Sequence, residues 1–221
     1  MHSRPKPPKH AIGDETRQML IDAATDVFIE SGFRAARVRD IADAAGIRLS
    51  AINYHFGSKE GLYFAVLQYH AENVIRSTPL TPPDPGLSLE ERFRFFIRAF
   101  VMRVLDPESP SRIARLIVRE ASNPTTALDM MFERFIQPQY SVLNELIAEL
   151  FGADTPPDTI ARAAISIVGQ IIVYAALQPL VAKFRPSFYG NAAKLEELAQ
   201  HIADFSWAGL QALAAQHRST P

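Results

Sequence analysis

Residues 37–56 read RVRDIADAAGIRLSAINYHF. Apolar residues recur at three- and four-residue spacing in 38–45 and again in 49–55, which predicts two short amphipathic helices. Gly46 lies between them, where a tight turn requires a positive φ that glycine adopts without strain. The stretch therefore predicts a helix-turn-helix, with Ile52 on the buried side of the second helix.

The opposite side of the second helix is expected to face the solvent. A helix of this length fits the major groove of DNA, where side chains at its N-terminus meet the base edges. The same pattern also fits a helical hairpin with no DNA role, so these residues alone leave both interpretations open. The residues expected to face outward are Leu49, Ser50, Ala51 and Asn53.

Helical spacing continues outside this stretch and no segment alternates as a half-buried strand does, so we predict an all-α fold of about nine or ten helices. Four prolines in 77–86 mark a boundary between two modules. Ser88 and Glu91 then form a capping box at the start of a helix. Pro138 lies within a predicted helix over 125–151 and should kink or divide it. The other helices predicted after the boundary span 110–122, 157–184 and 192–217.

These boundaries divide the chain into four parts. Residues 1–13 are basic, rich in proline and without an apolar face, which predicts a disordered arm. Residues 14–76 form an N-terminal three-helix domain that contains the helix-turn-helix. A proline-rich connector follows at 77–87, and 88–221 form a second helical domain.

The composition is that of a folded soluble protein, since 48% of the 221 residues are hydrophobic and the formal net charge is −1. The absence of cysteine excludes disulfides and thiolate ligands and is compatible with a cytoplasmic location. No apolar run follows the basic N-terminus, so a signal peptide is not expected. The segment 160–177 is the most membrane-like, but Arg162, Ser166 and Gln170 interrupt it, and we predict a buried helix instead.

The motifs that carry enzyme chemistry are missing from the sequence, which has no glycine-rich phosphate loop, nucleophile elbow or metal-ligand spacing. Its histidines are scattered and have no carboxylates at ligand spacing. We therefore predict no catalytic residue, no metal site and no cofactor. Two hypotheses remain: a DNA-binding regulator, and a helical small-molecule-binding or adaptor protein without specific DNA binding.

A longer stretch favours the first hypothesis. Residues 23–67 read AATDVFIESGFRAARVRDIADAAGIRLSAINYHFGSKEGLYFAVL, and this composite pattern resembles the TetR family of regulators. The block 116–152, LIVREASNPTTALDMMFERFIQPQYSVLNELIAELFG, further resembles the CecR-like branch. The resemblance implies a repressor that binds a pseudo-palindromic operator as a homodimer, that a small-molecule effector releases, and that has no membrane partner.

The resemblance also implies DNA contacts for individual residues. Arg39 is expected to touch a phosphate or a guanine, and Lys59 to neutralise a phosphate at a helix N-terminus, although both could be solvated surface charges. Asn53 stands where most members carry tyrosine; its amide either pairs with adenine or loses a phosphate contact. Tyr54 is expected to pack on the first helix more than to touch DNA. The complete predicted DNA-binding set is Arg37, Arg39, Leu49, Ser50, Ala51, Asn53, Tyr54, His55 and Lys59.

In this family the C-terminal module dimerises and holds a ligand pocket. The helices predicted near 157–184 and 192–217 are apolar beyond one core-facing stripe, which favours a four-helix bundle between two subunits over burial within one chain. Arg119 and Glu120 stand in an otherwise apolar helix as a structural ion pair, a surface turn or ligand anchors. Aromatic and soft apolar side chains line either a pocket or ordinary core. The predicted ligand-binding set is Phe96, Phe100, Arg119, Glu120, Met131 and Phe135.

Overall fold

The computed structural model describes residues 9–82, 84–105, 112–189 and 191–219, which form helices and loops without a strand. The predicted all-α fold class is confirmed. Because α7, a π-helical turn and α8 form one continuous rod, the eleven labelled α-helices of the described residues make ten rods. The bounds are α1 Lys9–Ala35, α2 Val38–Ala45, α3 Ser50–Phe56, α4 Lys59–Ser77, α5 Leu89–Leu105, α6 Ile113–Ser122, α7 Ala127–Met131, the π turn Phe132–Ile136, α8 Gln137–Phe151, α9 Pro157–Ala176, α10 Gln178–Phe184, a 3-10 turn Pro186–Tyr189 and α11 Ala192–Ser219.

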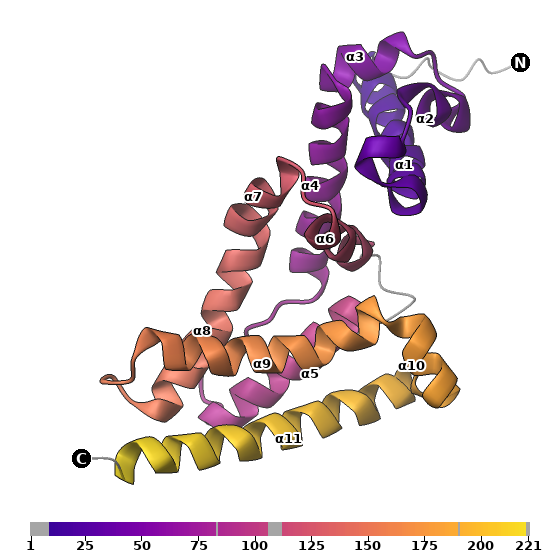
Figure 1. Ribbon diagram of the computed structural model, residues 1–221. Coiled ribbons are helices and arrows are strands. Elements are labelled where there is room, and N and C mark those ends of the chain that lie inside the picture. Colours follow the sequence, from indigo (N-terminus) through magenta and orange to yellow (C-terminus); the bar gives the residue numbers. More distant parts are fainter. Residues whose placement is uncertain (1–8, 83, 106–111, 190, 220–221) are drawn as a thin grey trace, which may run out of the picture.

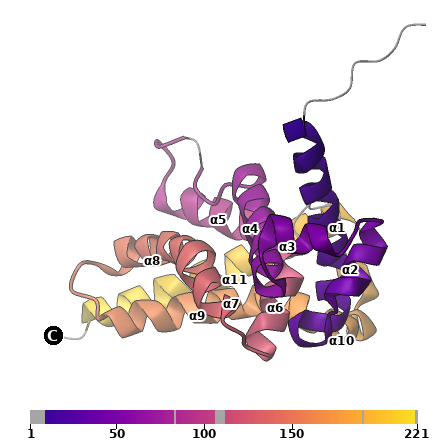
Figure 2. The same cartoon turned by 90° about the horizontal axis from the view of Figure 1, so that it is seen from above.

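The helices form two parts at opposite ends of the molecule (Figure 1). α1, α2 and α3 lie at one end, and α5, α9 and α11 lie together at the other. α4 runs from α3 toward the second part, with α6 and α7 between the two parts. Seen from above, α2 and α3 lie in front of the C-terminal helices (Figure 2). α3 is therefore far from α9 and α11.

Two hydrophobic cores hold these parts together, and they do not follow the order of the chain. One core joins α1 to α4 with Leu116 of α6 and Met131 of α7. The other joins α5, α8, α9 and α11, and includes Phe93 and Trp207, whose ring centroids lie 5.3 Å apart. The connector predicted at 77–87 separates α4 from α5, but α6 and α7 pack back onto the N-terminal core.

α1 begins earlier than the sequence pattern predicted. Residues 1–8 of the predicted arm lie outside the described residues, and residues 9–13 form the start of α1. The last proline of the arm is Pro8, so no proline interrupts the helix after it. Near the other end, Gly32 has φ 76° and ψ 166°, which kinks the chain before the helix finishes at Ala35.

Two prolines shape the later helices. Pro138 lies just after the π turn, which changes the hydrogen bonding of the predicted helix over 125–151 but leaves one continuous rod, so the expected division is not found. The helix predicted over 157–184 is divided at Leu177, which was not expected. Pro179 has no N–H to donate to the carbonyl four residues earlier, and a new helix starts around it.

The two helices on either side of the connector begin at side-chain caps. Ser58 Oγ accepts the Gly61 N–H at 3.0 Å at the start of α4. Before α5, the Ser88 N–H donates to Glu91 Oε2 at 2.8 Å and the Glu91 N–H donates to Ser88 Oγ at 3.3 Å. The Ser88 hydroxyl and its backbone N–H hold the pKa of Glu91 below its ordinary value. The predicted capping box is confirmed.

Candidate nucleic-acid interface and internal cavity

The turn between α2 and α3 fixes the direction in which α3 leaves the fold. Gly46 has φ 66° and ψ 27°, the left-handed conformation predicted for it. Its N–H donates to the Asp43 carbonyl at 3.1 Å, and the Ile47 N–H donates to the Ala42 carbonyl at 2.9 Å. This Schellman pattern ends α2 and starts the turn. The predicted helix-turn-helix is therefore present.

The end of α3 lies against the start of α4. A Cβ on Gly61 would lie 2.0 Å from the carbonyl oxygen of Phe56, so the two helices could not approach this closely with any other residue at that position. The guanidinium of Arg17 also lies 5.4 Å from the Phe56 ring centroid. α3 is thus held at its C-terminal end by both α1 and α4.

The side chains of α3 and of the residue before it divide into a buried and an exposed side. Ile52 is 1% exposed, whereas Leu49 is 44% exposed and Ser50 and Asn53 are exposed as well. Ala51 is half-buried and packs against the N-terminal core, so it faces outward less than expected. The exposed side is directed away from the rest of the molecule.

Tyr54 lies on this exposed side. It is 84% exposed, so the expectation that it packs on the first helix was wrong. Two residues of helix place it about 200° around the axis from the buried Ile52, which turns it to the solvent. Its ring meets the half-buried His55 edge-on, with centroids 4.9 Å apart.

Exposed arginines lie at the start of α2 and in the turn before α3. Arg37 precedes α2 without capping it, and Arg39 lies in its first turn; both are exposed. Neither guanidinium forms a hydrogen bond or an ion pair with another described residue. Arg48, in the turn before α3, is exposed too, and the sequence analysis missed it. Its position between two predicted helices was the signal that could have found it.

Lys59 has a structural contact that the sequence did not show. Its Nζ donates to the Arg34 carbonyl at 3.2 Å and lies 4.8 Å from the Phe33 ring centroid. These contacts tie the start of α4 to the end of α1. A phosphate contact by Lys59 stays a prediction.

An internal cavity of about 310 Å³ lies between α4, α5, α6, the π turn, α8 and α9. Its wall is almost wholly apolar, and Phe96, Phe100 and Phe135 of the predicted ligand-binding set line it. Met131 does not line it, because its side chain is completely buried in the N-terminal core. Among the described residues, no group of histidines and carboxylates is arranged to hold a metal ion.

Arg119 of α6 reaches α1 and not the cavity. Its Nη1 donates to the carbonyls of Ile29 at 2.9 Å and Glu30 at 3.2 Å. It also lies so close to Gly32 that a Cβ there would be 2.5 Å from its Nε. Together with Glu120 it lines a separate hollow of about 180 Å³ at the end of α1, and a ligand contact by Arg119 stays a prediction.

Glu120 of α6 is buried against α4. It accepts hydrogen bonds from the Tyr63 hydroxyl at 2.9 Å, and from the Thr125 N–H at 2.5 Å and hydroxyl at 2.6 Å. Burial, and then the hydrogen bond to Glu120, raises the pKa of Tyr63. Glu120 does not line the cavity either, so both polar residues of α6 connect it to the helix-turn-helix part.

Arg103 of α5 lines the cavity, and the sequence analysis missed it. It is 5% exposed, donates from Nε to the Thr78 carbonyl at 2.6 Å and donates from Nη1 to Gln139 Oε1. Burial lowers its pKa to about 10. Arg94 and Arg98 are four residues apart and share the outer face of α5. Arg103 comes five residues after Arg98 and therefore lies off that face, and this change of spacing was the signal available in the sequence.

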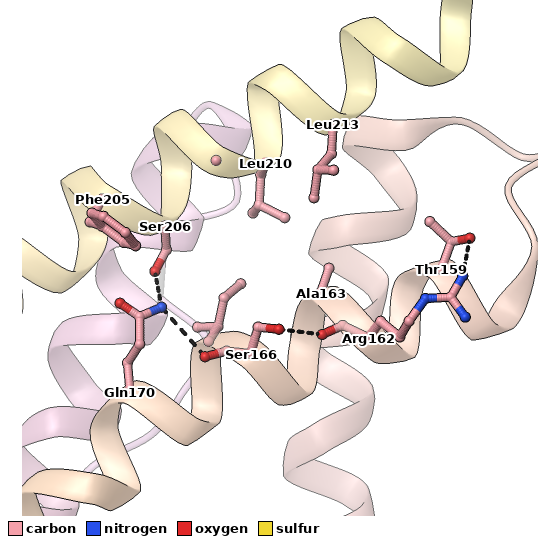
Figure 3. A pocket seen from close by; sticks show the side chains of 11 residues that line it. Thr159, Arg162, Ala163, Ser166, Gln170, Phe205, Ser206, Leu210 and Leu213 are labelled. Atoms are coloured by element: carbon pink, nitrogen blue, oxygen red, sulfur yellow. Dashed lines mark hydrogen bonds between the residues drawn. The ribbon is translucent and has the colours of Figure 1, made fainter. Parts of the chain in front are cut away.

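The outer face of α9 and α11 is hollowed and exposes large apolar side chains, and the hollow is lined by apolar residues together with Thr159, Arg162, Ser166, Gln170 and Ser206. A groove of about 370 Å³ lies between them, where Gln170 of α9 donates to Ser206 of α11 at 3.2 Å (Figure 3). Ile165 is 63% exposed and Phe205 65% exposed. The prediction that the helix over 160–177 is buried is therefore only half right, because just one of its sides meets the core.

α9 is long and apolar enough to span a membrane by length and composition alone, and 22% of its most apolar window is buried. Of the helices in the described ranges it is the one that passes this test. The same property is found in core and interface helices of soluble proteins.

An outward-facing helix-turn-helix, flanked by cations and joined to a helical body with an apolar cavity, defines a DNA-binding regulator. Comparison with known proteins gives the same class. Residues 20–66 match the model of bacterial regulatory proteins of the tetR family, and residues 89–210 match the C-terminal domain of the HTH-type transcriptional dual regulator CecR. CecR of Shigella flexneri is 31% identical over 175 residues, or 73% of this chain and 76% of that protein.

Other relatives share a part of the chain or the fold. The transcriptional activator FasR of Mycolicibacterium smegmatis is 45% identical over 62 residues, 28% of each chain. A TetR-like regulator from Rhodococcus sp. RHA1 is 22% identical, covers 93% of this chain and 98% of its own, and superposes with a TM-score of 0.62. AibR, solved with isovaleryl coenzyme A and operator DNA, has a TM-score of 0.62 at 15% identity, over 86% of this chain and 97% of its own.

The chain belongs to the TetR family of transcriptional regulators, in its CecR-like branch. The resemblance inferred from residues 23–67 and 116–152 is thereby confirmed.

Proposed function

We propose that the protein is a cytoplasmic repressor that binds a pseudo-palindromic operator as a homodimer and leaves it when a small molecule fills the internal cavity. The observation that carries the proposal is the exposed side of α3, where Ser50, Asn53 and Tyr54 are open to the solvent. Three exposed arginines at the start of α2 and in the turn before α3 accompany it, and their side chains pair with no described residue. A groove-reading helix needs both features, because base edges specify the site and phosphates position the protein.

Dimerisation is supported by the outer face of α9 and α11. Ile165 and Phe205 are largely exposed, and with the groove between the helices they form an apolar surface of the kind that subunits cover. Pairing this surface with its copy would make a four-helix bundle about a twofold axis. The two copies of α3 would then lie at the far end from the interface, in position for half-sites about 34–36 Å apart.

Release by a ligand is supported by the position of α6. Ile117 and Val118 line the cavity on one side of this helix, and Leu116 is buried in the N-terminal core on the other. Arg119 and Glu120 hold α6 to α1 and α4. A ligand that displaces α6 therefore moves the helix-turn-helix with it. Its effect on DNA binding equals its difference in affinity for the two positions.

The test is fluorescence anisotropy with a labelled promoter fragment from beside the protein's own gene and a scrambled fragment. We expect specific binding that weakens steeply with salt, since each neutralised phosphate releases counterions. Arg37→Gln and Arg39→Gln should each reduce the salt slope by about 1, while the exposed Arg115→Gln on α6 should not. Equal binding to both fragments, or none, would favour the adaptor hypothesis.

A further inference from the structure

The cavity contains a positive charge that has no negative partner among the described residues. Arg103 is 5% exposed, and no carboxylate of the described residues forms an ion pair with it. The other arginines of α5 differ: Arg92, Arg94 and Arg98 each pair with a carboxylate and are partly exposed. Burying an unpaired charge is unfavourable, so a guanidinium in this environment needs a compensating group.

The contacts of Arg103 hold the guanidinium in one orientation and leave part of it unused. Nε and Nη1 donate to Thr78 and Gln139, and Gln139 is itself fixed because its Nε2 donates to the Phe135 carbonyl. Nη2 has no acceptor among the described residues. A guanidinium has five N–H donors, so donors remain for a carboxylate that enters the cavity.

The rest of the cavity wall offers little to a polar ligand. Tyr140 is the polar aromatic residue among the described residues of the wall, and its hydroxyl already donates to the Ala161 carbonyl at 3.2 Å. Gln139 uses both ends of its amide, as described above. The occupant that fits is therefore apolar over most of its surface and has one anionic group.

We propose that the effector is a small amphipathic acid, whose carboxylate binds Arg103 and whose hydrocarbon body lies against Phe96, Phe100 and Phe135. This inference rests on the proposed function, because it names the ligand class of that cavity. The site also has a route to α3. Arg103 donates to the carbonyl of Thr78, the C-cap residue that follows α4, and the other end of α4 packs on α3.

Calorimetric titration of the full chain tests the ligand class without DNA. The probes are three matched pairs of an acid and its primary amide: octanoate and octanamide, decanoate and decanamide, and 4-phenylbutyrate and 4-phenylbutanamide. We expect at least one acid to bind tenfold or more tightly than its amide. Arg103→Met should remove this preference and Arg103→Lys should keep part of it. Arg115→Met is the matched control, since Arg115 is exposed on α6 and outside the cavity wall, and it should change nothing.

The proposal is overturned if no acid binds better than its amide, or if Arg103→Met keeps the preference. Should Arg103→Met not fold, the comparison of acid with amide on the unmodified protein decides the question. Failure of this proposal is distinguishable from failure of the proposed function. If neutral compounds and no acid release the promoter fragment, the chain is still a ligand-responsive regulator and only the acidic class of effector is wrong. If the chain does not bind the promoter at all, the proposed function fails, but the titration of acids and amides still gives its own result.

Discussion

Gly61 is the residue on which the placement of α3 depends most directly. A methyl group there would lie 2.0 Å from the backbone oxygen of Phe56, and a backbone atom cannot rotate away as a side chain can. Gly61→Ala should therefore separate α3 from α4, lower the free energy of unfolding by about 1–3 kcal/mol and abolish promoter binding. Urea denaturation and anisotropy measure the two effects.

Gly13→Ala is the control for this substitution. Gly13 is also helical, but nothing lies within 4 Å of its Cβ position. Alanine has the higher helix propensity, so this variant should be unchanged or up to about 1 kcal/mol more stable. Equal loss of binding in both variants would contradict the proposed role of the α3–α4 contact.

Substitutions of Tyr54 and Ile52 separate effects on DNA binding from effects on folding within α3. Tyr54→Ala removes a side chain that is 84% exposed, so stability should change by less than about 0.5 kcal/mol while promoter affinity falls. Ile52→Ala empties a buried site and should cost about 2–5 kcal/mol. Thermal melts and anisotropy on the same preparations distinguish the effects. Undiminished binding by a folded Tyr54→Ala would exclude this tyrosine from the interface.

At the scale of elements, α6 is the helix that touches both the cavity and the helix-turn-helix part. The buried bond between Tyr63 and Glu120 is one of its attachments. Tyr63→Phe should destabilise the protein by about 1–3 kcal/mol, because Glu120 loses a donor. It should also weaken the response of promoter binding to a ligand. A stable variant with an undiminished ligand response would show that this attachment does not transmit the signal.

The same bond predicts a dependence on pH. The pKa of Tyr63 is raised in the folded protein, so above its ordinary value of 10.0 the unfolded chain loses a proton that the folded chain keeps. Stability from this group is therefore complete below about pH 10 and declines as the pH rises further. The free energy of unfolding, measured by urea denaturation between pH 8 and 11, should decline less steeply with pH in Tyr63→Phe. Parallel pH profiles for the two proteins would contradict this.

Elements were predictable from the sequence where one residue determines the backbone locally. Gly46 and Ser88 act through their own φ and hydroxyl, and both did what their positions predicted, whereas beside Pro138 the rod stays continuous and contains a π turn. The roles of Arg119 and Glu120 were not decided, because their partners lie on α1 and α4, far away in the sequence. Burial of a charge depends on which helices surround it, and no spacing within one helix reveals that.

At the scale of the whole molecule, the face of α9 and α11 should make the protein a dimer. Ile165→Glu with Phe205→Glu places two charges on this exposed face, which should leave the monomer folded and prevent pairing. Light scattering after gel filtration should then give half the mass, with much weaker promoter binding. Phe132→Glu, half exposed on the π turn, is the control and should remain dimeric. A dimeric double variant would place the interface elsewhere.

The packing of α6 and α7 onto the N-terminal core affects how the protein can be divided. A fragment cut at the proline-rich connector would leave a hole where Leu116 and Met131 insert, and would lose the hydrogen bonds that close the end of α1. Such a fragment is a poor minimal DNA-binding module. Chimaeras that exchange recognition helices between relatives should carry α6 and α7 along with the N-terminal helices, so that the transplanted unit keeps the residues that complete its own core.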